Sequence, residues 1–69
     1  MMNSKFDVGD IIIKDFPTAD PNDYRIIVKK YKGSFFNKQR WLYDYYHLGN
    51  NYLDFDTVDY VDQTFKKVA

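Results

Sequence analysis

The chain has 69 residues, of which 45% are apolar, and its ten acidic and ten basic residues give zero net charge. This length supports one small domain. The chain has no cysteine and a single histidine, so neither a disulfide nor a zinc site is available to stabilise it. The longest apolar run is three residues, which excludes a membrane-spanning helix of about 20 apolar residues and a secretory signal. We therefore expect a cytoplasmic protein without a membrane partner.

The composition favours strands over helices. The sequence lacks glutamate, contains only two Ala and three Leu, and has thirteen Val, Ile and Thr residues. β-branched and aromatic side chains suit the half-buried surface of a sheet. Aspartate, the only acidic residue type present, prefers caps and turns to helix interiors. The composition therefore predicts an all-β fold.

The predicted elements are short and regularly spaced. Alternating apolar residues and chain breakers predict five strands, at about residues 6–13, 24–31, 39–48, 52–55 and 64–68. Residues 15–23 with two prolines and residues 32–38 with a glycine are expected to be loops, and Gly49-Asn50-Asn51 predicts a hairpin turn. Asp56 is the expected N-cap of a helical turn at about residues 57–62. Together these elements predict a single, partly open barrel with its helical turn before the last strand.

The predicted core is a set of apolar residues from the five strands and the helical turn. It comprises Val8, Ile12, Ile26, Val28, Leu42, Leu53, Phe55, Val61 and Phe65. Replacing a buried aromatic by alanine costs about 3–5 kcal/mol, and this is the effect expected for Phe55→Ala. A domain of this size has a total stability of roughly 5 kcal/mol, so that substitution is expected to unfold it.

Short motifs across nearly the whole chain carry a family resemblance. They are Phe6-x-Val8-Gly9-Asp10-x-Ile12, the Gly49-Asn50 turn after the third strand, and Val61-Asp62-x-x-Phe65-x-x-Val68. With these motifs the chain resembles the small SH3-like barrel proteins of Firmicutes bacteriophages. The resemblance implies a five-stranded SH3-like partly open barrel. It also implies a role in host takeover, since many such phage proteins bind and disable a host protein early in infection.

The charges are arranged in blocks. Residues 1–23 carry a net charge of −3, residues 24–41 carry +6 without an acid, residues 42–64 carry −5 without a base, and two lysines follow. These blocks have three interpretations. The charges can simply solvate the outer faces of the barrel, with opposite charges paired across adjacent strands. The acidic block can bind a protein, or the basic block can bind nucleic acid.

The acidic block predicts a surface for a basic host protein. Asp54, Asp56, Asp59 and Asp62 lie two or three residues apart, with Tyr52 and Tyr60 among them. Carboxylates on a rigid scaffold can mimic the phosphates of DNA and attract a protein that binds DNA. The hypothesis is therefore an inhibitor of a host DNA-transaction protein.

A linear motif points to the DNA polymerase sliding clamp as the target. The segment Gln39-Arg40-Trp41-Leu42-Tyr43 resembles the Gln-x-x-Leu-Phe peptide that docks in the hydrophobic pocket of bacterial clamps. Gln39 would bond to the pocket rim, Leu42 and Tyr43 would fill it, and Trp41 would add contact area. In its small size and its combination of an acidic surface with a clamp-like peptide, the chain is similar to the clamp inhibitors of Twort-like staphylococcal phages. The alternative is a core strand with a chance match, because alternate side chains of a strand point to opposite faces.

The basic block predicts a nucleic-acid interface as the alternative function. Tyr24, Tyr31 and Trp41 alternate with a set of cations that would neutralise phosphates, namely Arg25, Lys29, Lys30, Lys32 and Arg40. Small barrels are frequent hosts for this function. Zero net charge and ten aspartates are arguments against it.

Catalysis and cofactors are not expected. His47 is the only histidine, the chain has two serines and no cysteine, and nothing in the sequence brings a nucleophile to a base. The Asp54-x-Asp56 pair with Asp59 lacks the glycine and glutamate of a calcium loop. The adjacent aromatics Phe35 and Phe36 in a predicted loop indicate a contact surface, and from them we expect a homodimer.

Overall fold

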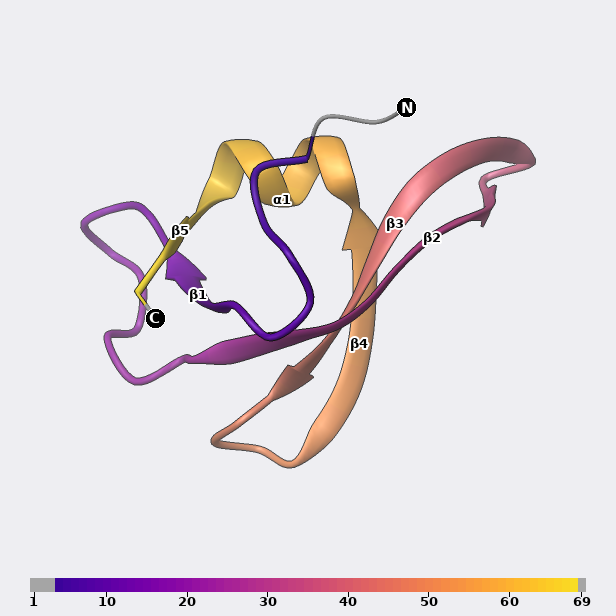
Figure 1. Cartoon of the computed structure of the whole chain (residues 1–69). Coiled ribbons are helices and arrows are strands. Elements are labelled where there is room, and N and C mark those ends of the chain that lie inside the picture. Colours follow the sequence, from indigo (N-terminus) through magenta and orange to yellow (C-terminus); the bar gives the residue numbers. More distant parts are fainter. Residues whose placement is uncertain (1–3, 69) are drawn as a thin grey trace.

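The protein is one antiparallel sheet of five strands with one short helix. The computed structural model describes residues 4–68, and the strands follow the order β4-β3-β2-β1-β5 across the sheet (Figure 1). The elements are β1 (Ile11–Lys14), β2 (Arg25–Phe35), β3 (Lys38–His47), β4 (Tyr52–Thr57), α1 (Val58–Thr64) and β5 (Phe65–Lys67). The predicted mostly-β fold of five strands with a helical turn before the last is therefore confirmed. Within residues 4–68 the sheet is open, because β4 and β5 form its two ends and do not pair.

Two predicted boundaries are wrong. The predicted loop at residues 32–38 is strand instead, because β2 and β3 continue to a tight turn at Phe36 and Asn37. Both turn residues have positive φ, 51° and 63°, as the central residues of a type I′ hairpin turn do. The first strand begins at Ile11 rather than near residue 6, since the segment before it bends at Gly9, whose φ is +97°. The long β2–β3 hairpin projects from the body of the molecule (Figure 1).

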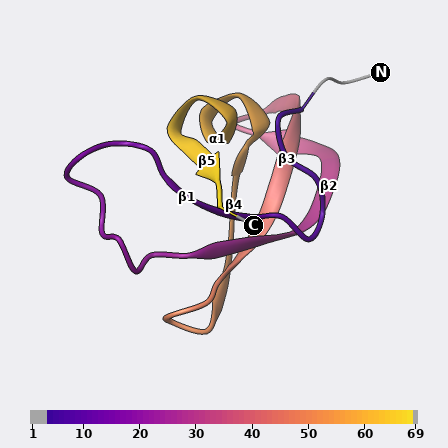
Figure 2. The same cartoon turned by 60° about the vertical axis from the view of Figure 1, so that its left-hand side comes forward.

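The helix begins one residue later than predicted. Thr57, not Asp56, is its N-cap, and the Thr57 hydroxyl accepts a hydrogen bond from the Tyr60 N–H at 3.3 Å. Val58 and Val61 lie one helical turn apart and are both buried. This short apolar stripe fixes α1 against one side of the sheet, and the loop between β1 and β2 extends away from it (Figure 2).

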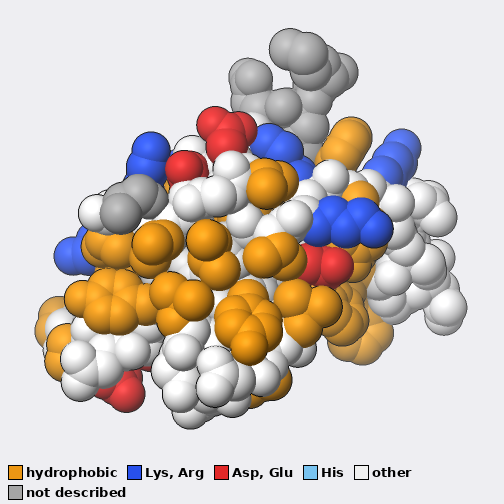
Figure 3. Space-filling model, turned by 60° about the horizontal axis from the view of Figure 1, so that its bottom comes forward, with side chains coloured by type: hydrophobic (Ala, Val, Ile, Leu, Met, Phe, Trp, Pro, Cys, Tyr) orange, Lys and Arg blue, Asp and Glu red, His pale blue; other side chains and the backbone are white. Residues whose placement is uncertain are grey.

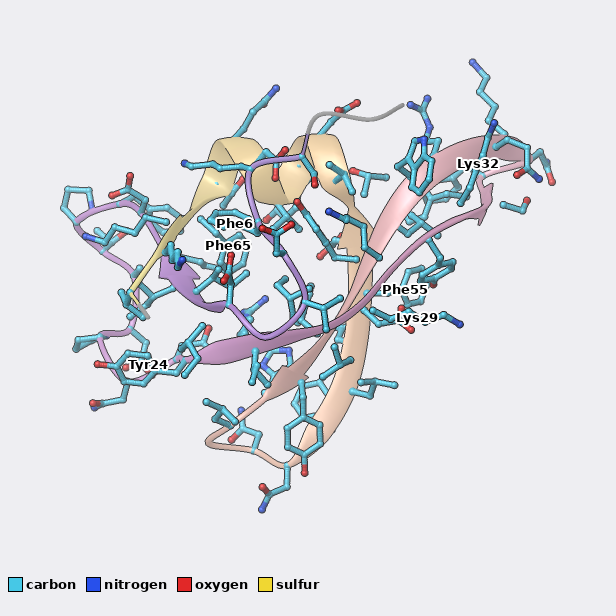
Figure 4. All side chains as sticks on the ribbon, viewed as in Figure 1. Phe6, Tyr24, Lys29, Lys32, Phe55 and Phe65 are labelled. Carbon is cyan, nitrogen blue, oxygen red and sulfur yellow. The ribbon has the colours of Figure 1, made fainter. Side chains whose placement is uncertain are left out.

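The core lies between α1 and the inner face of the sheet. Phe6 and Phe65 point into this space (Figure 4). The residues that are almost fully buried here are Phe6, Ile12, Ile27, Tyr43, Tyr45, Val58, Val61 and Phe65. Five of these eight residues are outside the predicted core list, namely Phe6, Ile27, Tyr43, Tyr45 and Val58.

Part of the predicted core is wrong. Ile12, Leu42, Val61 and Phe65 are buried, as expected, whereas Ile26 is only half-buried. The remaining four residues are 42–60% exposed, namely Val8, Val28, Leu53 and Phe55. On β2 and β4 the inner face is the opposite one from that predicted. The 3–5 kcal/mol cost predicted for Phe55→Ala is therefore too high, because 49% of that residue is exposed.

Candidate functional site

Three of the four predicted acidic site residues hold the fold together. The Tyr45 hydroxyl donates to Asp56 at 2.7 Å, and the Tyr43 hydroxyl donates to Asp62 at 2.9 Å. Asp54 accepts a hydrogen bond from the Phe55 N–H at 2.8 Å. The acidic residues therefore do not form one free face. Asp59 is exposed in the first turn of α1.

A buried polar cluster lies at the end of β2 and β3. The Arg25 guanidinium donates to the Asp23 carboxylate at 2.8 Å and packs over the rings of Tyr45 and Phe65, at 5.0 and 4.9 Å from their centroids. His47 lies beside it, 4% exposed, with one ring nitrogen 3.6 Å from Asp23. Arg25 Nε and both ring nitrogens of His47 are buried without a hydrogen-bond partner among residues 4–68, so the pair with Asp23 satisfies only part of this cluster.

His47 also links this cluster to β4. Its other ring nitrogen lies 3.6 Å from Asp54, and its ring stacks on Tyr52 with centroids 4.1 Å apart. A polar pocket of about 370 Å³ opens here between the β1–β2 loop and the β3–β4 turn. Among residues 4–68, no three His or Asp side chains gather as metal ligands. The ion pair of Arg25 with Asp23 and the stacking of His47 on Tyr52 hold the start of β2 and the end of β3 to their neighbours.

The Asp23–Arg25 pair predicts acid sensitivity. The hydrogen bond from Arg25 lowers the pKa of Asp23 below its ordinary value of 3.8. The stability that the pair contributes is therefore complete above about pH 4 and is lost as the pH falls through the lower, folded-state pKa. We expect Asp23→Asn to reduce the free energy of unfolding by about 1–3 kcal/mol at pH 7. In urea titrations from pH 7 to pH 2, this difference from the unsubstituted protein should shrink below pH 4. A difference that is constant over this range would contradict the prediction.

The clamp-like motif is built into the sheet. Leu42 is 2% exposed and Tyr43 is fully buried, and as neighbours on β3 they point to opposite faces. Tyr43 also shares hydrogen bonds with the backbone of Phe6, at 3.2 and 3.3 Å. Gln39 and Trp41 are exposed. Leu42 and Tyr43 therefore serve as packing residues, in agreement with the core-strand alternative.

Two of the five predicted nucleic-acid residues are already engaged within the protein. Arg25 is the buried partner of Asp23. Lys30 donates to the Ser4 hydroxyl at 2.7 Å and to the Phe6 carbonyl at 3.4 Å. Both cations therefore stabilise the N-terminal part of the fold.

The remaining cations lie on the projecting part of the β2–β3 hairpin, residues 29–41, which we call the arm. Lys29, Lys32 and Arg40 were predicted, and Lys38 was missed because the sequence placed it at the edge of a loop. These four cations make no ion pair with residues 4–68. No acid occurs between residues 24 and 43. Lys32 lies far from the core residues Phe6 and Phe65 (Figure 4), so the arm presents positive charge away from the body.

Two aromatic rings accompany these cations. Trp41 pairs with Lys32 across the hairpin and is 38% exposed. Phe36 occupies the turn at the tip, with 87% of its surface exposed and a φ of 51°. Bulky residues avoid positive φ, and within the chain the Phe36 ring packs edge-on against Phe35 with centroids 4.7 Å apart. The rest of the Phe36 ring is exposed.

Side chains of the arm join a second apolar cluster on the outer face of the sheet. Phe35 packs edge-on against Phe55 with centroids 6.2 Å apart, and Leu42 is buried on the same face. Gly33 permits this packing, because a Cβ atom there would lie 3.1 Å from the Tyr31 ring and 3.2 Å from Leu42. Side-chain packing therefore stabilises the arm in addition to the backbone hydrogen bonds between its two strands.

Comparisons with known proteins do not assign the chain to a family. No family model, no curated protein and no solved structure matches the chain. No helix among residues 4–68 has the length and apolar character needed to cross a membrane.

Proposed function

We propose that the protein is a binding module that contacts single-stranded nucleic acid through the arm. The observation that carries this proposal is Phe36, an exposed ring at positive φ on the tip of the arm, whose charged residues are all basic. Bases of a single strand stack on exposed aromatic rings, and nearby cations neutralise the phosphates. Duplexes keep their bases stacked on one another, so exposed rings favour the single strand.

The charge distribution supports this proposal despite the zero net charge. Asp54, Asp56 and Asp62 accept hydrogen bonds from other groups of the protein. These three carboxylates therefore have partners within the body of the molecule. Lys29, Lys32, Lys38 and Arg40 lie on the arm without an ion pair among residues 4–68, so a polyanion can contact them there. A local field of this kind attracts a charged ligand even when the whole protein is neutral.

The arrangement of elements supports an SH3-like barrel as the finer description of the fold. A meander of strands, a long bent hairpin and a helical turn before a last strand that pairs with β1 agree with that architecture. Small barrels of this kind bind nucleic acids and proteins on exposed strands. Fold alone does not assign function, so the proposal depends on the arm. The cytoplasm of the host cell is the proposed place of action.

Removing the two cations Lys32 and Arg40 should weaken nucleic-acid binding. With fluorescently labelled 12-nucleotide single strands, the Lys32→Ala/Arg40→Ala variant should bind at least about tenfold more weakly. Its salt dependence should flatten by about 1.4 units, since each lost phosphate contact on a single strand accounts for about 0.7. Phe36→Ala should lose about 1–3 kcal/mol of binding free energy through lost stacking, with the salt slope unchanged.

The matched control removes two cations from β5. Lys66 and Lys67 pair with Asp15 and Asp10 at 3.8 and 3.4 Å, and Lys66→Ala/Lys67→Ala changes the net charge by the same amount. We expect this control to bind nearly as well as the unsubstituted protein at physiological salt. Equal losses in both variants, or no binding of any strand at 100 µM protein, would rule out the arm as the interface.

Inhibition of a host DNA-transaction protein by a phage-type protein is the second candidate, with the sliding clamp as the predicted target. The exposed neighbours Asp59 and Tyr60 at the start of α1 favour it, because both are free to contact a basic partner. A purified clamp that binds the protein and loses this binding with Asp59→Asn would favour the second candidate. In that case the labelled strands should not bind.

A further inference from the structure

The outer face of the sheet carries an apolar patch that no part of the described chain covers. Tyr46 on β3 stands opposite Ile26 on β2 and Leu53 on β4, and alternation along the strands extends this row. We define the outer patch as Tyr24, Ile26, Tyr46, Leu48, Leu53 and Phe55. Its side chains are half-buried or exposed, up to 58% for Leu53. Figure 3 shows apolar side chains side by side across this face.

The patch faces away from the core. Tyr24 and Phe55 lie on the side of the sheet opposite to α1, whereas Phe6 and Phe65 lie beneath the helix (Figure 4). Monomeric proteins rarely leave several neighbouring large apolar side chains in water. An apolar sheet face is normally covered by another sheet or by helices. The patch therefore requires an occupant from outside the described chain.

The charges at the border of the patch match a second copy of the same face. Lys29 on β2 and Asp44 on β3 stand opposite each other in register, one positive and one negative. The Tyr31 hydroxyl donates to Asp44 at 2.9 Å, and the Lys29 ammonium lies 4.9 Å from the Tyr31 ring centroid. A two-fold axis that runs parallel to the strands, between β2 and β3, places each of these charges over its opposite on the other copy. Such self-complementarity is what an isologous interface requires.

The position of the patch also suits a dimer. It lies on three neighbouring strands of the sheet, β2, β3 and β4. Two sheets packed face to face lie about 10 Å apart with interdigitated side chains.

We infer that two copies of this chain pack through the outer patch to form a two-fold symmetric dimer. This surface differs from the Phe35-Phe36 pair that the sequence indicated. Phe35 packs against Phe55 within one chain, and Phe36 lies at the tip of the arm. The dimer uses Lys29 at the start of the arm but leaves the tip of each arm with Phe36 free, and it does not depend on the proposed binding of nucleic acid.

Sedimentation equilibrium tests the dimer with a matched pair of variants. At 100 µM the unsubstituted protein should have twice its chain mass of 8.3 kDa. Leu53→Asp should sediment as a monomer, because it places a charge in the patch. Val8→Asp is the control, since Val8 is 60% exposed outside the patch, close to the 58% of Leu53. Circular dichroism should show that both variants are folded. A monomeric unsubstituted protein at 200 µM would overturn the inference.

Exchanging the charges of Lys29 and Asp44 distinguishes a second copy of this chain from any other binding partner. Lys29→Glu alone places two acids together across the axis, and Asp44→Lys alone places two cations together. Each variant should dimerise at least tenfold more weakly than the unsubstituted protein. An equimolar mixture should recover the dimer, because the mixed pair restores one opposite-charge contact on each side of the axis. No recovery in the mixture, with Leu53→Asp still a dimer, would place the interface elsewhere.

Discussion

Replacement of Phe65 by alanine is expected to unfold the protein. Phe65 is 1% exposed and packs against the Tyr45 ring with centroids 6.2 Å apart, and it lies beneath the Arg25 guanidinium. Removing such a ring costs about 3–5 kcal/mol, through lost burial and the cavity that remains. A chain of this length is stabilised by roughly 3–10 kcal/mol in total. Thermal and urea unfolding followed by circular dichroism should show a protein that is largely unfolded or has lost most of its stability.

Phe55→Ala is the matched control for this experiment. The same atoms are removed, but from a residue that is 49% exposed on the outer face. Its cost should be about 1 kcal/mol, because a half-exposed ring loses little burial and leaves no closed cavity. Equal destabilisation by Phe55→Ala and Phe65→Ala would show that the inner face is assigned to the wrong side of β4.

Arg25→Met should lower the free energy of unfolding by about 3 kcal/mol. Methionine keeps much of the apolar stem but leaves the Asp23 carboxylate without its cation, and breaking a buried pair in this way costs about 3–5 kcal/mol. The lower end applies because the Asp23 side chain is 23% exposed and keeps some contact with water. Urea unfolding at pH 7 provides the measurement.

Arg40→Met gives the comparison for Arg25. Arg40 is exposed on the arm, and substitutions at such sites change stability by about 0.5 kcal/mol or less. The two variants remove the same charge, so they separate a structural arginine from a surface arginine. If Arg25→Met cost less than 1 kcal/mol, the polar cluster would have no part in stability.

The succession of elements was predictable, but the inner face of two strands was not. Ile26 and Val28 on β2, like Leu53 and Phe55 on β4, gave an alternating apolar pattern that pointed to burial. The structure instead turns Arg25 inwards and directs Asp56 to the Tyr45 hydroxyl. Alternation indicates which residues share a face but does not choose the buried face when polar side chains find partners inside.

The candidate site was only partly predicted, because the sequence does not show which cations have partners inside the protein. Sequence reasoning found Lys29, Lys32 and Arg40 but grouped them with Arg25 and Lys30, which have partners within the protein. The partner of Arg25 is Asp23, two residues before it, and the partner of Lys30 is Ser4 in the N-terminal segment. Contacts between distant segments depend on the register of the sheet, which the local pattern does not contain. The exposed aromatic pair was predicted, but the two-residue turn was missed because Phe36-Asn37 lacks the glycine typical of such turns.

An open sheet leaves a backbone edge to which other strands can add, and the Asp54 side chain limits that growth on β4. Its carboxylate accepts the N–H of Phe55, so an incoming strand would have to displace a charged acceptor to use that donor. Strand edges protected by charge resist end-to-end polymerisation. Association of two copies through the face of the sheet ends at a dimer. Association through the strand edges would add further copies without limit. A chain with so many exposed aromatic side chains can therefore form a finite assembly rather than a fibre.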